Sequence, residues 1–231
     1  MTESLGILGG MGPLASAEFL KTIYEFNISG PEQSAPACIL YSDPSVPDRT
    51  QAIITGSEDL MLGRLTTALE NLTQLKVGNI VVACITSHHL FPKLPAHLSA
   101  KIISLVDLII SDVLRSQKKS LLLCSDGTRK KQLFERHKQW NEARHFIVLP
   151  SDDDQATIHG LIYQLKLNGS MQDAIESVFE LLERYQLNSF IAACTEIHLV
   201  TKHLLRDGPR SQEYQAIDPL MTLAKNLGSF S

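Results

Sequence analysis

A ten-residue stretch that occurs twice constrains the fold of this chain more than any other feature. Residues 79–88 are NIVVACITSH and residues 189–198 are SFIAACTEIH, so Cys84 and Cys194 stand at equivalent places 110 positions apart. Each copy predicts the end of an apolar helix, a tight turn, a short buried strand and then the cysteine. A repeat of this length favours two similar halves that have the same local structure.

Short apolar runs alternate with stretches of helical periodicity along the rest of the chain. We expect further strands over residues 5–9, 38–42, 102–106, 120–124 and 146–150. Helices are expected after the first glycine loop, around residues 62–72, after the acidic turn 152–154, over 170–185 and from Asp218 to Gly228.

This alternation predicts an α/β protein of two similar lobes. Each lobe is expected to hold a mainly parallel sheet flanked by helices. The repeat further predicts a pseudo-twofold relation between the lobes, with the active-site cleft between them, where the carboxyl ends of the strands meet. We expect residues 1–98 with 209–231 to form the first lobe and residues 99–208 to form the second.

The composition excludes several classes of protein. The net charge is −4 and no block of five or six like charges occurs, which argues against a nucleic-acid surface. Asp107 and Asp112 interrupt the most apolar run, so no membrane span is expected. The first residues lack the pattern of a secretory signal, which favours a cytoplasmic location. The four cysteines contain no Cys-x-x-Cys pair, so neither a disulfide scaffold nor a zinc ribbon is indicated.

The glycine loop after the first strand allows two interpretations. Residues 10–15, GMGPLA, fit the loose G-x-G-x-x-G/A pattern of a dinucleotide site. That fingerprint also needs an acidic residue about 20 positions later, and Asp43 lies too far along the chain. The alternative is that the loop and the helix behind it direct backbone N–H groups at a small carboxylate.

The repeated cysteines also allow a metal site. Cys84 with His88 and Cys194 with His198 form two Cys-x-x-x-His pairs, and four such ligands suit zinc when each pair shares a helix face. Each cysteine is expected at a strand end, however, with the histidine inside the following helix. The spacing therefore does not ensure the required geometry.

Acid–base chemistry is the third interpretation of the cysteine pair. A thiol between a strand and a helix N-terminus lies near positive charge, which lowers its pKa. Two thiols on opposite sides of one small molecule can remove a proton from one face and return a proton to the other, which is racemisation or epimerisation. Each sulfur would lie about 3–3.5 Å from the reacting carbon, which puts the two sulfurs roughly 7 Å apart. A disulfide needs about 2.05 Å and is excluded in that state.

Four stretches of the chain carry a resemblance to a known family. They are GGMGP at residues 9–13, PDR at 47–49, ACITSH at 83–88 and ACTEI at 193–197. With the two-lobe layout they resemble the cofactor-independent aspartate/glutamate racemases, and most closely the aspartate racemases. The resemblance implies an isomerase with no cofactor and no metal, aspartate as the small-molecule substrate, and a homodimer. Glutamate or a broader set of acidic amino acids is the alternative substrate, and a zinc-binding or small-acid-binding protein without catalysis is the alternative class.

The resemblance also implies roles for individual residues. Cys84 and Cys194 would be the two catalytic acid/base residues, and Arg49 would clamp a substrate carboxylate through two hydrogen bonds. Lys166 would be the second cation for a dicarboxylate, although taken alone it is equally a solvated lysine at a helix end. Glu196 would contact the substrate ammonium or tune Cys194. The remaining expected substrate-binding residues are Met11, Gly12, Ile85, Thr86, Ser87, Ser125, Thr128 and Thr195.

Ile85 is a departure from the family pattern. The family usually has asparagine after the first cysteine, and the loss of that amide removes a polar group from the site. We expect this change to affect substrate preference. The two-cysteine mechanism does not depend on it, because both thiols are present.

Overall fold

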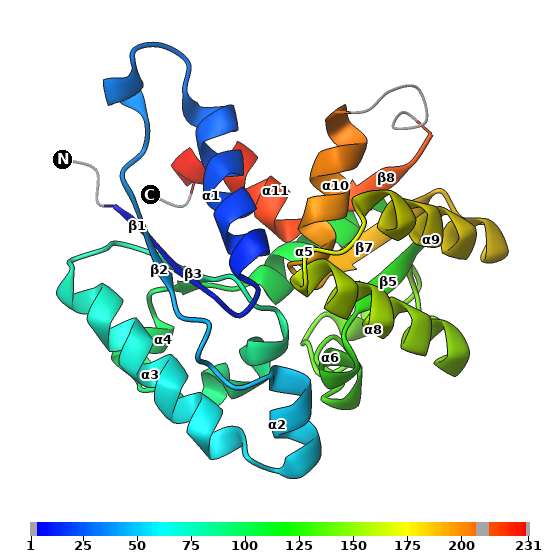
Figure 1. Ribbon diagram of the computed structural model, residues 1–231, viewed down its shortest axis with the longest axis horizontal. Helices are drawn as coiled ribbons and strands as arrows, with labels where there is room; N and C mark the ends of the chain where they lie inside the picture. The colour runs from blue at the N-terminus through cyan, green and yellow to red at the C-terminus, as the bar shows by residue number, and fades with distance from the viewer. Residues whose placement is uncertain (1–3, 207–212, 230–231) are drawn as a thin grey trace. The chain divides into compact units, whose positions relative to one another are not determined.

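The computed structural model describes residues 4–206 and 213–229, which form two compact units, each built on one four-stranded parallel sheet (Figure 1). Unit 1 comprises the described chain up to Leu105 and from Leu220 onward, and unit 2 runs from Val106 to Pro219. The sequence-based prediction of two α/β halves with parallel sheets is confirmed.

The sheet of unit 1 has the strand order β2-β1-β3-β4. Its strands are β1 (Leu5–Gly9), β2 (Cys38–Ser42), β3 (Ile80–Val82) and β4 (Ile102–Ile103). The connecting helices are α1 (Pro13–Asn27), α2 (Arg49–Thr55), α3 (Glu58–Gln74), the 3₁₀ helix η2 (Thr86–Lys93) and α4 (Ala96–Ser99), and α11 (Pro219–Lys225) follows near the end of the chain.

The sheet of unit 2 repeats this order as β6-β5-β7-β8. Its strands are β5 (Ser120–Cys124), β6 (Ile147–Val148), β7 (Ser189–Ala193) and β8 (Gln215–Ile217). The helices are α5 (Leu105–Ser116), α6 (Asp126–Lys130), α7 (Trp140–Ala143), α8 (Asp152–Lys166), α9 (Met171–Arg184) and α10 (Ile197–Arg206).

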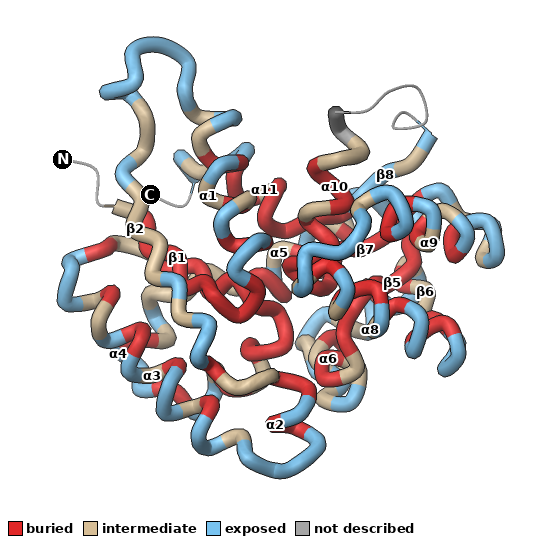
Figure 2. The backbone as a smooth tube through the Cα atoms, viewed as in Figure 1, coloured by how far each residue is buried: buried red, intermediate tan, exposed pale blue. Residues whose placement is uncertain are grey.

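The inner strands are almost continuous runs of buried residues, as is typical of parallel strands covered on both faces. Strands β1, β3, β5 and β7 are buried along their whole length (Figure 2). Leucines at helical spacing on α3, including Leu65, Leu69 and Leu72, pack with β3 in the core of unit 1. Val178 and Leu182 of α9 pack in the same way with β7 in the core of unit 2.

The turns before β3 and β7 also repeat. Lys76 and Gln186, again 110 positions apart, both have left-handed backbones with φ of 58° and 54°. This conformation ends a helix by turning the chain sharply, and a residue other than glycine rarely adopts it. In the first turn the left-handed residue lies two positions before Gly78.

Several elements differ from the sequence-based prediction. The short helices α2, α4, α6 and α7 were not expected, and the strand expected over residues 146–150 is only Ile147–Val148. The strand expected over residues 102–106 is only Ile102–Ile103, because Leu105 begins α5, whose buried residues recur at helical spacing. The short strand β8 was not expected at all. It pairs with β7 through the register Phe190 to Ala216 and completes the second sheet.

The division into units differs from the expected lobe boundaries because of the strands with which β4 and β8 pair. One expected boundary, 208/209, falls within residues 207–212, outside the described residues. Residues 215–217 belong to the second sheet because β8 pairs with β7, whereas the sequence had placed them in the first lobe. The other boundary lies at Leu105 rather than at 98/99, because β4 pairs with β3 of the first sheet.

The start of α8 is fixed by a buried carboxylate. Asp154 accepts hydrogen bonds from the Ser151 hydroxyl at 2.9 Å and from the Tyr185 hydroxyl at 2.7 Å, and it also pairs with Arg184. These contacts join α8 to the end of α9, which lies beside it (Figure 1). The Tyr185 hydroxyl, above all, lowers the pKa of Asp154.

Over the described residues, no helix combines the length and the apolar character needed to cross a bilayer.

Candidate active site

Each sheet has one place where its strand order reverses, and ligands of open α/β sheets bind beyond the carboxyl ends of the strands at such a point. In unit 1 it lies between β1 and β3, which pair through Leu8 and Val82. The loop 10–12 follows β1 there, and Cys84 follows β3. In unit 2 the point lies between β5 and β7, with Ser125 and Cys194 as the following residues. Each unit therefore places its repeated cysteine where a ligand is expected.

The Cys84 turn is held from inside by its own neighbours. The Ser87 hydroxyl donates to the carbonyl of Cys84 at 2.7 Å, and His88 Nδ1 lies 3.0 Å from the same oxygen. The Leu105 N–H donates to His88 Nε2 at 3.0 Å. Since a carbonyl only accepts, Nδ1 carries the proton and Nε2 is the acceptor, so both ring nitrogens of His88 are engaged.

The burial of the turn is uneven around the thiol. Cys84 is 6 % exposed, whereas Ser87 is completely buried and Ile85 is nearly so. The polar atom of Ser87 therefore contacts the backbone of the turn, and Ile85 contributes an apolar side chain where the family has an amide. Thr86, 5 % exposed, is the remaining expected binding residue of this turn.

A second pair of side chains fixes the same turn from α3, and sequence reasoning missed it. His89 Nδ1 lies 2.6 Å from the carbonyl oxygen of Thr86, and Nε2 lies 2.5 Å from Glu58 Oε1. Both partners are hydrogen-bond acceptors, so the ring carries two protons or the Glu58 carboxyl holds the shared one. No pattern in the sequence links positions 31 residues apart, so only the adjacent histidines could have hinted at this contact.

The Cys194 turn of unit 2 has a different partner. Cys194, 7 % exposed, lies with its sulfur 2.8 Å from Glu196 Oε2 and donates a hydrogen bond to it. The Thr195 hydroxyl lies 3.4 Å from the same oxygen. Glu196 is only 2 % exposed, and its other oxygen, Oε1, has no hydrogen-bond partner among the described residues.

The histidine of this second turn is also held differently. His198 Nδ1 lies 2.7 Å from Asp218 Oδ2, and both side chains are 1 % exposed. Asp218 follows β8, so the pair joins the start of α10 to the end of that strand. Asp218 was not among the predicted residues. Its only signal in the sequence was its position before the last helix.

The glycine loop is explained by packing within unit 1. Gly10 has φ +88°, and a Cβ atom there would lie 2.3 Å from the backbone nitrogen of Asp43. A Cβ atom on Gly9 would lie 2.5 Å from the Ser16 side chain. Close approach of the loop after β2 therefore requires glycine, and no dinucleotide is needed to account for the pattern.

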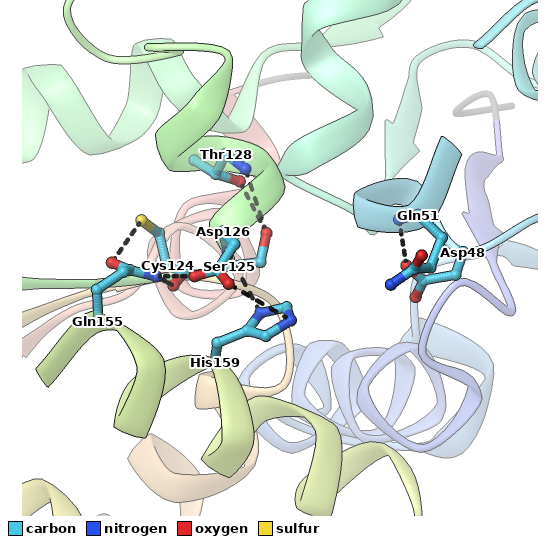
Figure 3. Close-up of polar contacts among 8 residues, drawn as sticks. All are labelled: Asp48, Gln51, Cys124, Ser125, Asp126, Thr128, Gln155 and His159. Carbon is cyan, nitrogen blue, oxygen red and sulfur yellow. Dashed lines mark hydrogen bonds and ion pairs between the residues drawn. The ribbon is translucent and has the colours of Figure 1, made fainter. Parts of the chain in front are cut away.

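Arg49 joins the loops that follow β1 and β2. It is the first residue of α2, behind Asp48, whose carboxylate caps the helix by accepting from Gln51 N at 2.9 Å (Figure 3). The guanidinium donates to the carbonyl of Pro47 at 3.1 Å and to that of Met11. Arg49 is 8 % exposed, so its charge lies buried against the loop that holds Met11 and Gly12.

In unit 2 the hydroxyl turn after β5 caps a short helix. Ser125 accepts from Thr128 N at 3.3 Å, and the two hydroxyl oxygens are 3.3 Å apart. Gln155 of α8 donates to Cys124 O at 2.9 Å and to Asp126 Oδ1 at 2.8 Å (Figure 3). His159 Nδ1 accepts from the Asp126 N–H at 3.3 Å. Neither Gln155 nor His159 was predicted, and their four-residue spacing on α8 was the available signal.

Lys166 ends α8 and is not an ordinary solvated lysine. Its Nζ atom lies 4.2 Å from the centre of the Tyr163 ring, and the side chain is half-buried. This cation–π contact draws the ammonium group back along the helix.

The two cysteines outside the repeat have lost acidity. Burial raises the pKa of Cys38 to about 11 and that of Cys124 to about 12. Neither forms much thiolate near neutral pH, which separates them from the role proposed for the repeated pair.

The zinc interpretation has no support in the geometry. His88 has no lone pair left for a metal, because one ring nitrogen donates to Cys84 O and the other accepts from Leu105 N. Over residues 4–206 and 213–229, no group of three or more His, Cys, Asp or Glu side chains is arranged as a metal site.

Two surface hollows of unit 1 lie apart from these residues. One of about 460 Å³ follows the outer face of α1, and another of about 440 Å³ lies between α3 and the end of β2. None of the predicted site residues lines either hollow.

Comparison with known proteins shows the family to which this chain of two α/β units belongs. The profile of the Asp/Glu/Hydantoin racemase family matches residues 8–226. The chain belongs to this family, whose members act on small amino-acid substrates.

Relatives with different substrates share the whole length of the chain. The broad-specificity amino-acid racemase RacX of Bacillus subtilis is 23% identical over 229 residues, covering 96% of this chain and 95% of the relative. Aspartate racemase of Picrophilus torridus has the same fold, with a TM-score of 0.80, 23% identity and coverage of 96% and 91% of the two chains. Glutamate racemase of Francisella tularensis gives a TM-score of 0.63 at 15% identity, over 99% of this chain and 80% of that one.

Proposed function

We propose that this racemase interconverts L- and D-aspartate through two-base proton transfer by Cys84 and Cys194. The observation that carries the proposal is their matched placement. Each cysteine lies in the turn that follows an inner strand of a parallel sheet, at the switch point of its own unit. Each cysteine is also slightly exposed.

The chemistry needs one thiolate and one thiol. The thiolate takes the proton from Cα of one enantiomer, and the thiol gives a proton to the opposite face of the carbanion. When the other enantiomer reacts, the two roles are exchanged. In each direction one Cα–H bond breaks and another forms, so no oxidant and no other reactant is required.

The weak acidity of the α-hydrogen sets the second requirement. Without pyridoxal phosphate as an electron sink, charge on the substrate carboxylate must be stabilised by cations and N–H donors that are already in position. Arg49 has a buried guanidinium beside the Met11 loop, and Lys166 holds its ammonium over Tyr163. We assign the carboxylates of a dicarboxylic substrate to these two cations, with Gly12, Thr86, Ser125, Thr128 and Thr195 as hydroxyl or backbone donors.

A broader substrate range is the alternative, and one residue favours it. Ile85 is buried and apolar at the position after the first cysteine. An isoleucine at this position cannot make the polar contact to the substrate that an amide would make, so selection for an acidic side chain is weaker. One relative is described as a broad-specificity racemase.

A chiral assay across aspartate, glutamate and neutral amino acids decides between these substrates. We expect aspartate to give the highest kcat/KM. In deuterium oxide, product of inverted configuration must carry solvent deuterium at Cα, and unlabelled product would sink the two-base scheme. A protein that binds aspartate and exchanges no α-proton would be a binding module instead.

The remaining expectations concern assembly and cofactor. We propose a homodimer that is active without pyridoxal phosphate. Sedimentation equilibrium tests the dimer. Unchanged activity after treatment with hydroxylamine, which removes pyridoxal phosphate, tests the second point.

A further inference from the structure

The two cysteine turns occupy corresponding places in the sequence, but the three residues after the cysteine differ, and one of these differences introduces a charge. Position 196 in unit 2 corresponds to position 86 in unit 1, and these hold glutamate and threonine. The Cys194 sulfur donates to a buried carboxylate at 2.8 Å. For Cys84, no hydrogen bond to the sulfur occurs in the described part of unit 1, where Thr86 offers a neutral hydroxyl.

A proton shared between Cys194 and Glu196 belongs on sulfur. A free glutamic acid releases its proton about four pH units below a free cysteine. The contact is therefore a thiol that donates to a carboxylate. Loss of that proton would leave two negative charges 2.8 Å apart in a buried site, where like charges strongly disfavour ionisation.

Among the described residues, the hydrogen-bond contacts of the Glu196 carboxylate are with Cys194 and Thr195, and neither is a cation. The Thr195 hydroxyl lies near Oε2, and Oε1 is buried without a partner among the described residues. His198, in the first turn of α10, contacts the Asp218 carboxylate, which follows β8. Lys202 lies further along α10, and Asp126 lies beyond the neighbouring strand β5.

We propose that Glu196 is a positioning residue that keeps the proton on Cys194 in the free enzyme, so that Cys84 starts the reaction as the thiolate. This inference rests on the proposed two-cysteine function. The two cysteines then differ in protonation before the substrate binds. The enantiomer whose α-hydrogen faces Cys84 meets the enzyme in its resting form.

The protons balance through one full turnover. The Cα–H bond breaks, its proton forms the S–H bond of Cys84, and the electron pair remains on Cα. The S–H bond of Cys194 then breaks, and its proton forms the new Cα–H bond on the other face. Cys194 is left as a thiolate beside Glu196. Exchange with water returns a proton to Cys194 and removes one from Cys84, which restores the starting form.

Comparison of kcat/KM in the two directions would not reveal this inequality. The two enantiomers have equal free energy in water, so their kcat/KM values must be equal in the wild-type protein and in every variant. The protonation of each sulfur has to be measured directly.

The test is the pH dependence of alkylation by iodoacetamide, followed for each cysteine by mass spectrometry of its peptide. In the wild-type protein, we expect the rate at Cys84 to reach half its maximum at a lower pH than the rate at Cys194. The reverse order, or equal midpoints, would overturn the proposal without any variant having to fold. Cys38 and Cys124 serve as internal references, because burial raises their pKa values to about 11 and about 12.

Variants at position 196 sharpen the test. Glu196→Gln removes the charge and offers an N–H donor to the thiolate, so the Cys194 midpoint should fall by about one pH unit or more while the Cys84 midpoint stays unchanged. Glu196→Asp keeps the charge and should restore most of the wild-type value. An unmoved Cys194 midpoint in a folded Glu196→Gln protein contradicts the proposal, as does a rise in KM for aspartate as the only effect.

The same variants separate this proposal from the proposed function. If the alkylation pattern is as expected and no amino acid is racemised, the protonation of the turn stands and the function is wrong. If racemisation requires both cysteines and the midpoints are equal, the function stands and the role of Glu196 is wrong. A third readout is α-proton exchange in deuterium oxide by single-cysteine variants. Glu196→Gln should change its pH profile in the Cys84→Ala background and leave it unchanged in the Cys194→Ala background.

Discussion

The turns at Cys84 and Cys194 show how one local fold supports two different sites. Both follow an inner parallel strand, and both are preceded by a left-handed residue, Lys76 or Gln186. Past the cysteine they diverge. The first continues as a 3₁₀ helix, η2, that contains Pro92, whereas the second begins α10.

Their polar contacts diverge with the backbone. In the first turn, Ser87 and His88 converge on the carbonyl of Cys84, so the turn is held by its own main chain. In the second turn, Cys194 contacts Glu196 and His198 contacts Asp218. The hydrogen-bond partners there are side-chain carboxylates instead of a backbone carbonyl. The two turns thus share the position of the sulfur and differ in the charge beside it.

The largest effect should come from removing either sulfur. Cys84→Ala and Cys194→Ala each delete one proton carrier, and the reaction needs both in every turnover. A positioned acid or base contributes about 10²–10⁴-fold, so each variant should lose at least about 10²-fold in kcat. Chiral chromatography of L- and D-aspartate measures it.

Cys38→Ala is the matched control for these two variants and should retain activity, because Cys38 lies outside the repeat. Full activity in either Cys84→Ala or Cys194→Ala would show that the two turns do not form one catalytic pair.

The cations expected from the two units should differ in importance. Arg49 is buried and donates to three backbone carbonyls, those of Met11, Val46 and Pro47, whereas Lys166 is half-buried over Tyr163. Loss of one fixed donor to a developing charge typically costs about 10²–10³-fold in kcat. Arg49→Lys should reduce kcat/KM for aspartate by about 10²-fold, and Lys166→Met should reduce it less.

Steady-state kinetics checks this order, with Arg64→Lys, an exposed arginine of α3, as the control. A greater loss in Lys166→Met than in Arg49→Lys would place the main carboxylate clamp in unit 2.

The repeated features were the predictable part of the structure. The cysteine strands, their buried character and the preceding turns follow from two aligned stretches of sequence, and both parallel sheets follow from the alternation of elements. The run from Ile102 to Leu114 was ambiguous, because a short apolar segment suits a buried strand or a buried helix equally well. The strand β8 has only three residues, two of them exposed, so it gave almost no hydrophobic signal.

The unpredicted contacts are those between distant residues. Glu58 with His89, Gln155 with Cys124 and Asp218 with His198 each join residues 20 or more positions apart. Each depends on how a helix packs against a strand end, which no local pattern encodes. Glu196 was noticed because it lies two residues from Cys194. Its contact with the sulfur was one of two roles left open.

The two histidines provide a smaller, structural test. His198→Gln removes the imidazole that pairs with the buried Asp218 carboxylate, which should lower the free energy of unfolding by about 2–3 kcal/mol. His88→Gln removes no carboxylate pair: it removes the hydrogen bonds to Cys84 O and Leu105 N and the ring contact with Phe91, and should cost about 1–2 kcal/mol. Urea unfolding followed by circular dichroism measures both. Equal losses would mean that the carboxylate does not distinguish the two turns.

The last comparison concerns the segments that follow β2 and β6, the corresponding edge strands of the two sheets. Each contains a carboxylate with a lowered pKa. The Ser45 hydroxyl and backbone N–H lower that of Asp43, and the Tyr185 hydroxyl, with Ser151 and Arg184, lowers that of Asp154. A lowered pKa in the folded state gives stability that is present above the unfolded value of about 3.9 and lost as pH falls through the folded value.

Replacing each carboxylate by its amide should therefore matter at neutral pH and matter less in acid. Asp154→Asn breaks contacts between two helices, and at pH 7 it should cost about 1–3 kcal/mol. Asp43→Asn disturbs one local turn and should cost about 0.5 kcal/mol or less. Thermal unfolding between pH 7 and pH 3 should show the Asp154→Asn deficit in Tm shrinking as the wild-type carboxylate becomes protonated. A deficit that stays constant with pH would mean that the hydroxyl contacts of Asp154, and not its charge, hold α8 against α9.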